Sequence, residues 1–248
     1  HLRIEFLVMA IFNHGIATSA DDEVVTKSCR FDGGSYIHRN FGSGGDQKTW
    51  TFAAWVKLGD LSQGGERGTI FSSSGAYSGA PTGGPSIWTD EGGLRFAHTH
   101  DVTGSPDFVR MTKAIYRDPA AWYHVVWWCD MTVSTGTRWK IYVNGELQEL
   151  EDSSTSSYNG GEPAYDTDLG INTDGESHVI GTYAGEYFDG LLADVYFVDG
   201  AAITPTLNFT NNPATDTNGQ LKPIAYDMSS HSGNSFHLPF TDNAGEQV

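Results

Sequence analysis

A cluster of side chains with metal-ligating oxygen atoms lies in and beside the longest polar stretch of the chain. Asp166, Asp168, Asn172, Asp174 and Glu176 place five carboxylate or amide side chains within eleven residues. Calcium prefers hard oxygen ligands in such numbers, so the sequence predicts a calcium site in this loop. The spacing does not match an EF-hand, and an ordinary solvated loop is the alternative interpretation.

Aromatic side chains near glycine-rich segments form a second group that could bind a ligand. Sugars stack their apolar faces on exposed aromatic rings, while side-chain amides and carboxylates bind their hydroxyls. The candidates lie in or beside glycine-rich loops: Tyr77, Trp88, Tyr158, Tyr165 and Tyr183. The sequence therefore predicts glycan contacts at these rings, and the alternative is that each is an isolated surface aromatic.

Carboxylate pairs suited to glycan hydrolysis are scarce. A glycosidase needs two carboxyl groups about 5–5.5 Å apart for retention, or about 6.5–9.5 Å apart for inversion. Glu149 and Glu151 have the i, i+2 spacing that puts two side chains on one face of a strand. However, they follow a hairpin, where charged residues are typical of a solvated edge. The sequence also contains no Gly-x-Ser-x-Gly elbow and no phosphate-binding loop, so we expect no enzyme activity.

Charge and cysteine content restrict the partners. The chain has 14 Lys and Arg against 31 Asp and Glu, a net charge of −17, so we expect neither nucleic acid nor a membrane surface as a partner. An acidic surface is compatible with calcium, with neutral glycans or with solubility alone. Cys29 and Cys129 lie outside any CxxC or His/Cys cluster, which predicts two buried free thiols and no zinc site.

The stretch from Trp122 to Gly145 predicts the centre of a β-sheet. It begins with a run of β-branched and aromatic residues, and Trp139–Val143 then alternates apolar and polar side chains. Asn144–Gly145 is typical of a type I′ hairpin turn, which predicts a return strand over residues 146–150. Residues 48–58 carry apolar side chains on both faces, which predicts a central strand.

The whole pattern predicts roughly ten to twelve short strands, no long helix and no internal repeat. Two antiparallel sheets packed face to face are the natural outcome for such a pattern. We therefore expect an extended arm over residues 1–27, one sandwich domain over residues 28–240 and a tail over residues 241–248. The arm is either a solvated segment or one that reaches a neighbouring subunit.

Five motifs in a fixed order carry a resemblance to a known family. They are FDG (31–33), TWTFAAWVK (49–57), WYHVV (122–126), KIYVNG (140–145) and YFDGLLADVYFVDG-x-x-ITP (187–205). The order resembles the concanavalin-A-like, laminin-G-like jelly-roll superfamily. More narrowly, it resembles the version found in virion proteins of tailed bacteriophages, including phages of marine bacteria and cyanobacteria.

The resemblance implies an all-β, two-sheet antiparallel jelly-roll sandwich of the concanavalin-A-like lectin/glucanase type. It further implies that the first and last strands pair, here Cys29–Phe31 with Phe236–Leu238. Members of the family are usually glycan-binding or structural modules and are often assisted by calcium, and some relatives are glycanases. Calcium is thus the one cofactor that we expect.

Together these observations predict a non-enzymatic virion-surface structural protein of a bacteriophage, a capsid decoration or accessory protein whose sandwich binds host or environmental glycans. The expected partners are other virion proteins, contacted through the arm, and polysaccharide, with the chain in a homo-oligomer or lattice on the virion. A tail-fibre or tailspike adhesin for cell-surface polysaccharide is the first alternative, although the chain has no heptads and no repeat shaft. A glycan-degrading enzyme is the second.

Overall fold

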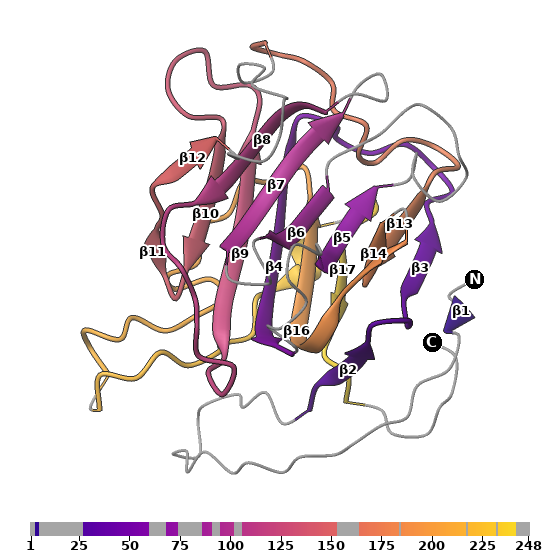
Figure 1. The fold of residues 1–248 in the computed structure, drawn as a ribbon. Helices are drawn as coiled ribbons and strands as arrows, with labels where there is room; N and C mark the ends of the chain where they lie inside the picture. The colour runs from indigo at the N-terminus through magenta and orange to yellow at the C-terminus, as the bar shows by residue number, and fades with distance from the viewer. Residues whose placement is uncertain are drawn as a thin grey trace.

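The structure, a computed structural model, is a sandwich of two sheets (Figure 1). It describes residues 3–4, 27–59, 68–73, 86–90, 95–101, 106–152, 164–183, 185–216, 218–231 and 233–241. The larger sheet consists of β1 (Arg3–Ile4), β3 (Ile37–Asn40), β5 (Gly68–Ser73), β6 (Ser86–Asp90), β7 (Arg95–Asp101), β8 (Pro106–Thr112), β12 (Leu150–Asp152), β13 (Ser177–Ile180), β14 (Thr182–Tyr183) and β15 (Glu186–Tyr187). The smaller sheet consists of β2 (Cys29–Asp32), β4 (Thr49–Leu58), β9 (Tyr123–Asp130), β10 (Trp139–Val143), β11 (Glu146–Leu147), β16 (Asp189–Asp199) and β17 (Phe236–Leu238). A single 3-10 turn, η1 (Met228–Ser230), completes the described elements, so the predicted all-β sandwich is confirmed.

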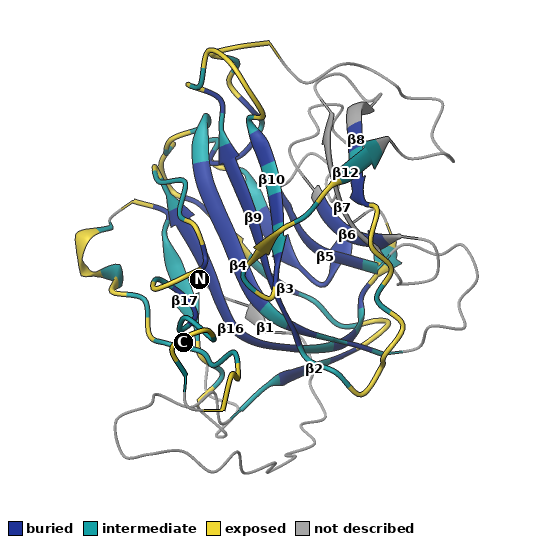
Figure 2. Cartoon of the chain, turned by 90° about the vertical axis from the view of Figure 1, so that its left-hand side faces the viewer, coloured by how far each residue is buried: buried dark blue, intermediate teal, exposed yellow. Residues whose placement is uncertain are grey.

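The larger sheet ends at β12 and the smaller sheet ends at β11, and these two edges lie on the same side of the molecule (Figure 2). The larger sheet runs β1-β3-β13-β5-β6-β7-β8-β12, with β15 beside β5 and β14 beside β15. The smaller sheet runs β11-β10-β9-β4-β16-β17, with β2 also paired to β16. Figure 2 faces the side where β10 and β12 lie, and it shows the two layers next to each other with the buried residues concentrated in their strands.

Large aromatic side chains fill the space between the sheets. Phe52 of β4 stacks on Phe71 of β5 across the two layers, with ring centroids 4.7 Å apart. Trp50 of β4 meets Trp139 of β10 edge to face at 5.5 Å. These rings are fully or almost fully buried, and burying an aromatic side chain contributes about 1.5–3 kcal/mol. The core thus uses the inward positions that strand alternation predicts.

The central position of β4 is confirmed, since it pairs with β9 on one side and β16 on the other. Its outward side chain Ala53 belongs to a second apolar cluster, with Val126, Tyr196, Val198 and Phe209. Phe209 lies in residues 201–231, which we call the strap. The strap covers the outer face of the smaller sheet, and this cover explains why β4 is apolar on both faces.

The predicted hairpin after β10 is confirmed, but its return strand is shorter than predicted. Asn144 and Gly145 have φ values of 51° and 85°, as a type I′ turn requires. Strand β11 ends at Leu147, and Leu150 already pairs with Thr112 of the larger sheet. The single strand predicted over residues 146–150 is therefore wrong, because the chain crosses between the sheets so that Leu150 can pack against the main core.

The direct pairing of the first and last strands is also wrong. Strand β2 pairs with Asp189–Leu192 of β16, whereas β17 pairs with Val195–Phe197 of the same strand. The register of β16 against β4 shifts between Ala193 and Tyr196, and Asp194 there has a φ of 49°. Strand β16 is long enough to hold β2 and β17 one after the other along one edge.

Cys29 and Cys129 are both free and buried, as predicted. Burial raises the pKa of the Cys29 thiol to about 12, which makes it a poor nucleophile. Most of the predicted arm and tail, residues 5–26 and 242–248, lies outside the described residues. In the part of the chain that the structure describes, no helix has the length and apolar character needed to cross a bilayer.

Candidate functional site

The structure describes the side chains of two of the five predicted sugar-stacking residues, Trp88 and Tyr165, and these two lie in different environments. Trp88 lies within β6, is 3% exposed and clusters with Val109 and Met111 of β8. The prediction that Trp88 is an accessible ring is wrong. Trp88 pairs with Ala97 of β7, and Ala97 pairs with Met111 of β8, so the three residues lie in one row on the same face of the sheet. Tyr165 is 53% exposed and stays a candidate.

The other three predicted rings give less information. The backbone of Tyr183 lies in β14, where it pairs with Glu186. Tyr77 and Tyr158 lie outside the described residues. The glycan contacts predicted for these three residues therefore stay predictions.

The five predicted calcium ligands separate into different environments. Asp166 and Asp168 form ion pairs with Lys48 Nζ, at 3.0 and 3.5 Å. Asn172 is buried, and its Nδ2 donates to the carbonyl oxygen of Asp46 at 2.7 Å. Asp174 is exposed in a turn.

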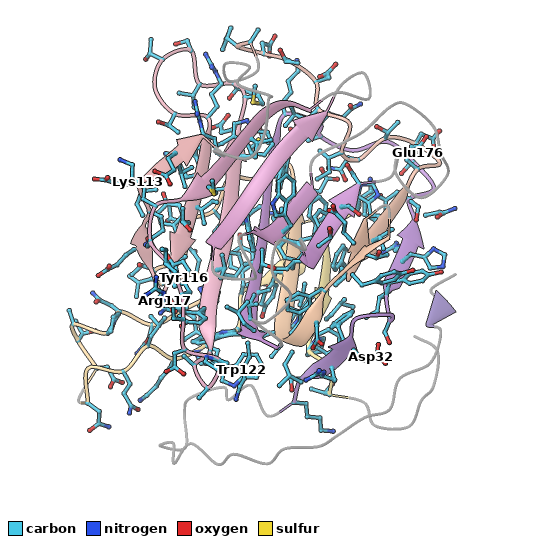
Figure 3. All side chains as sticks on the ribbon, viewed as in Figure 1. Asp32, Lys113, Tyr116, Arg117, Trp122 and Glu176 are labelled. Carbon is cyan, nitrogen blue, oxygen red and sulfur yellow. The ribbon has the colours of Figure 1, made fainter. Side chains whose placement is uncertain are left out.

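Glu176, the fifth residue, lies at the upper right in Figure 3, and its backbone carbonyl accepts the Phe41 N–H. Among the residues that the structure describes, no group of three or more His, Cys, Asp or Glu side chains is arranged to hold a metal ion. The structure therefore does not gather the five residues around one point. Calcium binding stays a prediction.

Asp199 joins the loops at this end of the sandwich. Its Oδ1 accepts the Asp46 N–H at 2.8 Å and the Asn172 side chain at 3.0 Å, and its Oδ2 accepts the Asn234 N–H at 3.2 Å. A Cβ on Gly45 would lie within 3 Å of the Asp199 carboxylate, so this close approach requires glycine. We call residues 41–48, 164–176, 199–201 and 233–235 the loop end.

A buried histidine completes the loop end. His178 Nε2 accepts the Asn172 N–H at 3.1 Å, and its ring stacks on Phe41 at 3.9 Å. Burial lowers the pKa of His178 to about 3, so the ring is neutral at physiological pH. Many polar groups of the loop end therefore bind one another, an arrangement that fixes loop geometry.

A groove opens instead at the edge where β8 and β12 of one sheet approach β10 and β11 of the other. Its volume is about 650 Å³, within the usual range of ligand pockets. We call it the edge groove. It is lined by Arg110, Lys113, Thr137, Trp139, Lys140, Leu147, Gln148, Glu149, Leu150 and Glu151.

Three lining residues belong to the inner sides of the sheets. Trp139 is part of the main core, and Leu150 packs against it. Arg110 also lies on the core-facing side of its sheet. It pairs with His98 of β7, and His98 pairs with Ile87 of β6, which belongs to the core. An arginine thus lies on the core-facing side of β8 where the larger sheet ends.

Charged and amide groups form the rim. Lys113 Nζ lies 3.1 Å from Glu149 Oε2 in an exposed ion pair, and Lys140 Nζ lies 3.8 Å above the Trp128 ring. Gln148 is held at both ends of its amide, because Nε2 donates to the Glu146 carbonyl and Oε1 accepts the Tyr116 hydroxyl at 3.0 Å.

The segment between β8 and β9 supports this rim. Tyr116 meets Tyr123 edge to face at 5.1 Å, and burial raises the pKa of Tyr116 to about 12, so its hydroxyl stays protonated and donates to Gln148. Lys113, Tyr116 and Arg117 follow one another down the left side in Figure 3, the side of β11 and β12. Trp122, at the end of the segment, is half-buried and lies at the lower end of the molecule.

Most of this groove has no signature in the sequence. The spacing of Glu149 and Glu151 after a hairpin predicts a solvated edge, and no local pattern connects these residues with Arg110 or Lys140. The one local signal is Arg110 itself, a charge within the apolar run Phe108–Met111. The groove arises from the crossing of residues 148–150 between the sheets, which no local pattern predicts.

Comparison with known proteins places the fold. The family model described as the concanavalin A-like lectin/glucanases superfamily matches residues 31–206. A search of curated proteins finds no match.

Solved structures are similar at low identity. A native heptameric SAP-like pentraxin from Limulus polyphemus is 16% identical, with 85% of this chain and 90% of that chain covered and a TM-score of 0.49. The receptor-binding domain of botulinum neurotoxin C/D mosaic serotype is 15% identical, with 82% and 44% covered and a TM-score of 0.50. Domain 4 of a GH43 extracellular arabinanase from Geobacillus stearothermophilus, solved with arabinotriose, is 16% identical, with 82% and 84% covered and a TM-score of 0.47.

At such identities the likeness concerns the fold alone, and the chain spans less than half of the neurotoxin chain. The family model, in contrast, matches well over half of this chain, from the end of β2 to the start of the strap. The chain therefore belongs to the concanavalin A-like lectin/glucanases superfamily.

Proposed function

We propose that the chain is a non-enzymatic carbohydrate-binding module that holds glycans in the edge groove. The observation that carries the proposal is the lining of a groove of about 650 Å³ by both polar and apolar groups. Membership of a lectin-containing superfamily agrees with such a role. The fold alone does not establish it, since function depends on the site.

The lining suits the chemistry of a sugar. Each sugar hydroxyl both donates and accepts hydrogen bonds, and Gln148, Glu149 and Lys113 offer donors and acceptors side by side along the rim. The C–H faces of a sugar need apolar contact, which Leu147 and Leu150 supply in the same groove. Leu147 is 57% exposed, so its side chain is accessible to a ligand in the groove.

The carboxylates of the groove fit binding better than catalysis. Glu149 and Glu151 both line it, so the geometry of a hydrolase is the alternative to test. The Glu149 side chain is 82% exposed and held by the Lys113 ammonium. It lacks the apolar enclosure around the proton donor of a glycosidase. We therefore assign these two residues to hydroxyl binding.

A glycan array followed by calorimetry tests the proposal. The double variant Lys113→Ala/Gln148→Ala should lower the affinity for the best glycan at least tenfold, because both side chains lie on the rim. Arg117→Ala is the matched control, an exposed cation on the same segment outside the groove lining, and it should bind as the parent chain does. Absence of binding to any glycan contradicts the proposal, and release of reducing sugar that Glu149→Gln abolishes replaces it with a hydrolase.

The biological setting is the second part of the proposal. The last of the five sequence motifs, YFDGLLADVYFVDG-x-x-ITP (187–205), is the main support for a virion-surface protein of a bacteriophage, a capsid decoration or accessory protein in contact with other virion proteins. A tail-fibre adhesin is the alternative. Mass spectrometry of purified particles from a host that carries this gene tests both, because it reports whether the chain is present and with which shell or tail proteins it crosslinks.

Calcium belongs to the proposal only as a prediction from the sequence. Asp166 and Asp168 already contact the ammonium of Lys48, which an ion would have to displace. A thermal-shift titration with calcium and with EDTA tests it. A ligand that binds the folded chain alone raises Tm with concentration.

A further inference from the structure

We infer that the edge groove selects saccharides that carry a carboxylate, such as a uronic acid residue, and that Arg110 recognises the acid. This inference rests on the proposed function, because it names the ligand class of the same groove. Three observations support it: the local charge, the position of Arg110, and the way Lys113 is held.

The groove has a charge opposite to that of the chain as a whole. Arg110, Lys113 and Lys140 line it, against the two carboxylates Glu149 and Glu151. The groove lining is thus +1 in a chain of net charge −17, which leaves −18 for all other residues. A local positive region inside a strongly acidic molecule favours a compact anion that fits within it.

Arg110 lies where a guanidinium is most effective. It faces the inner side of the larger sheet, near the core residue Trp139 and near Leu150, which packs against the core. A charge flanked by apolar groups interacts more strongly with an opposite charge than one in open water. The planar fork of arginine also matches the two oxygens of a carboxylate, an interaction that lysine and glutamine do not reproduce.

Lys113 is held by a contact that a ligand can replace. The Lys113–Glu149 pair has side chains that are 52% and 82% exposed, and exposed pairs of this kind are weak. Lys140 lies over the Trp128 ring, on the face of β10 opposite to the core residues Trp139 and Ile141, so its ammonium attracts an anion in the groove only at longer range. Lys113 can therefore contact a sugar carboxylate without breaking a buried ion pair.

The remaining charge limits the size of the anion. A polysulfated chain extends beyond the groove and meets a surface that carries most of the −18 charge, so at low salt it is repelled. A short saccharide with one or few carboxylates keeps its charge inside the positive region. The inferred ligand is therefore a uronate-containing oligosaccharide rather than a sulfated polymer.

Calorimetry on the unmodified chain gives the first test. Trigalacturonate and its methyl ester have the same shape and differ in the charge of the carboxyl groups. We expect the acid to bind at least tenfold more tightly than the ester, and more tightly than a heparin oligosaccharide at 50 mM salt. Equal affinities for acid and ester overturn the inference while leaving the proposed function intact, whereas no binding to either probe or to a neutral glycan array contradicts both.

Variants give the second test. Arg110→Gln should remove the preference for the acid, with affinity for the ester within twofold of the parent, and Arg117→Gln should change neither. Lys113→Gln should lower the affinity for the acid alone, by about threefold, and it decides the matter if Arg110→Gln does not fold. An Arg110→Gln chain that keeps its parent fold and the full preference for the acid overturns the role of Arg110.

Discussion

The loop end and the edge groove are both rich in polar residues, yet the structure uses them in opposite ways. At the loop end, one carboxylate of Asp199 accepts three hydrogen bonds from three separate loops, and Lys48 holds Asp166 and Asp168. At the edge groove, the charged side chains are spread along a rim and much of their surface faces solvent. Polar groups that bind one another build a structure, whereas polar groups that face solvent around a cavity can bind a ligand.

This difference explains why a cluster of polar residues in the sequence is a poor guide to a site. The five predicted calcium ligands form the most conspicuous cluster, but several of their polar groups are engaged within the loop end. The groove residues are dispersed between positions 110 and 151 and look ordinary one by one. Four experiments can separate the two regions.

Lowering the pH should have the largest effect, and it should lower the free energy of unfolding. Burial lowers the pKa of both His124 and His178 to about 3, below the ordinary value of 6.5. Between pH 6.5 and 3 both histidines are therefore protonated in the unfolded chain and neutral in the folded chain. Stability that is fully present above pH 6.5 is lost as the pH falls toward 3. We expect about 1.4 kcal/mol per pH unit for each histidine, or about 5 kcal/mol between pH 6.5 and 4.5.

Urea denaturation across this range measures the slope. Asp32, Asp216 and Asp227 have lowered pKa values and act in the same direction, but only below their ordinary value of 3.8. His178→Gln should halve the slope, because it removes the titration at the loop end and leaves His124. A flat profile between pH 6.5 and 4.5 shows that neither ring is buried as described.

Removal of the Asp199 carboxylate should have the next largest effect. Asp199→Ala leaves the N–H groups of Asp46 and Asn234 and the side chain of Asn172 without their acceptor. We expect the free energy of unfolding to fall by about 2–4 kcal/mol, with glycan affinity at the edge groove unchanged. Asp174→Ala, an exposed carboxylate of the same end, is the control and should change stability by less than about 0.5 kcal/mol.

A substitution on the rim of the groove should lower glycan affinity more than it lowers stability. Gln148→Ala alone removes an amide that Tyr116 holds toward the groove, so we expect about a fivefold loss of glycan affinity, near 1 kcal/mol. The free energy of unfolding should fall by about 1 kcal/mol or less, because the two hydrogen bonds that are lost are part-buried or exposed. A large loss of stability without loss of affinity would place Gln148 with the structural residues.

Tyr165 should show the smallest effect, and it decides between the regions. Its ring is 53% exposed beside Asp166 at the loop end. If glycans bind only in the edge groove, Tyr165→Ala changes both affinity and stability very little, by less than about 0.5 kcal/mol. A tenfold loss of affinity moves the glycan site to the loop end and restores the prediction made from the sequence.

The sequence predicted the architecture better than the site, for a physical reason. Alternation along Trp50–Trp55, the apolar run at Tyr123–Cys129 and the turn at Asn144–Gly145 are local patterns, and local patterns determine strands and hairpins. Which strand lies beside which depends on contacts far apart in the chain. The places of β2 and β17 on β16, and the crossing at residues 148–150, could not be derived from such patterns.

Trp88 illustrates the same limit. It lies between two glycine-containing turns, Gly83–Gly84 and Gly92–Gly93, which suggest exposure although Ile87 directly before it is apolar. Its neighbours in space are Val109 and Met111, which strand pairing brings from some twenty residues away. Burial of a side chain on a strand depends on the adjacent strands and on what covers them, and neither is encoded next to it.

The arrangement of β2 and β17 along one edge of β16 has a consequence for engineering. Lys27, just before β2, contacts the backbone of Thr241, just after β17, so these two points of the chain adjoin. A short glycine linker from residue 241 back to residue 27 would close the chain into a loop that can be reopened elsewhere, as circular permutation requires. The same proximity suits residues 27–241 to insertion into a surface turn of a carrier protein, because both connections to the carrier would leave from one point.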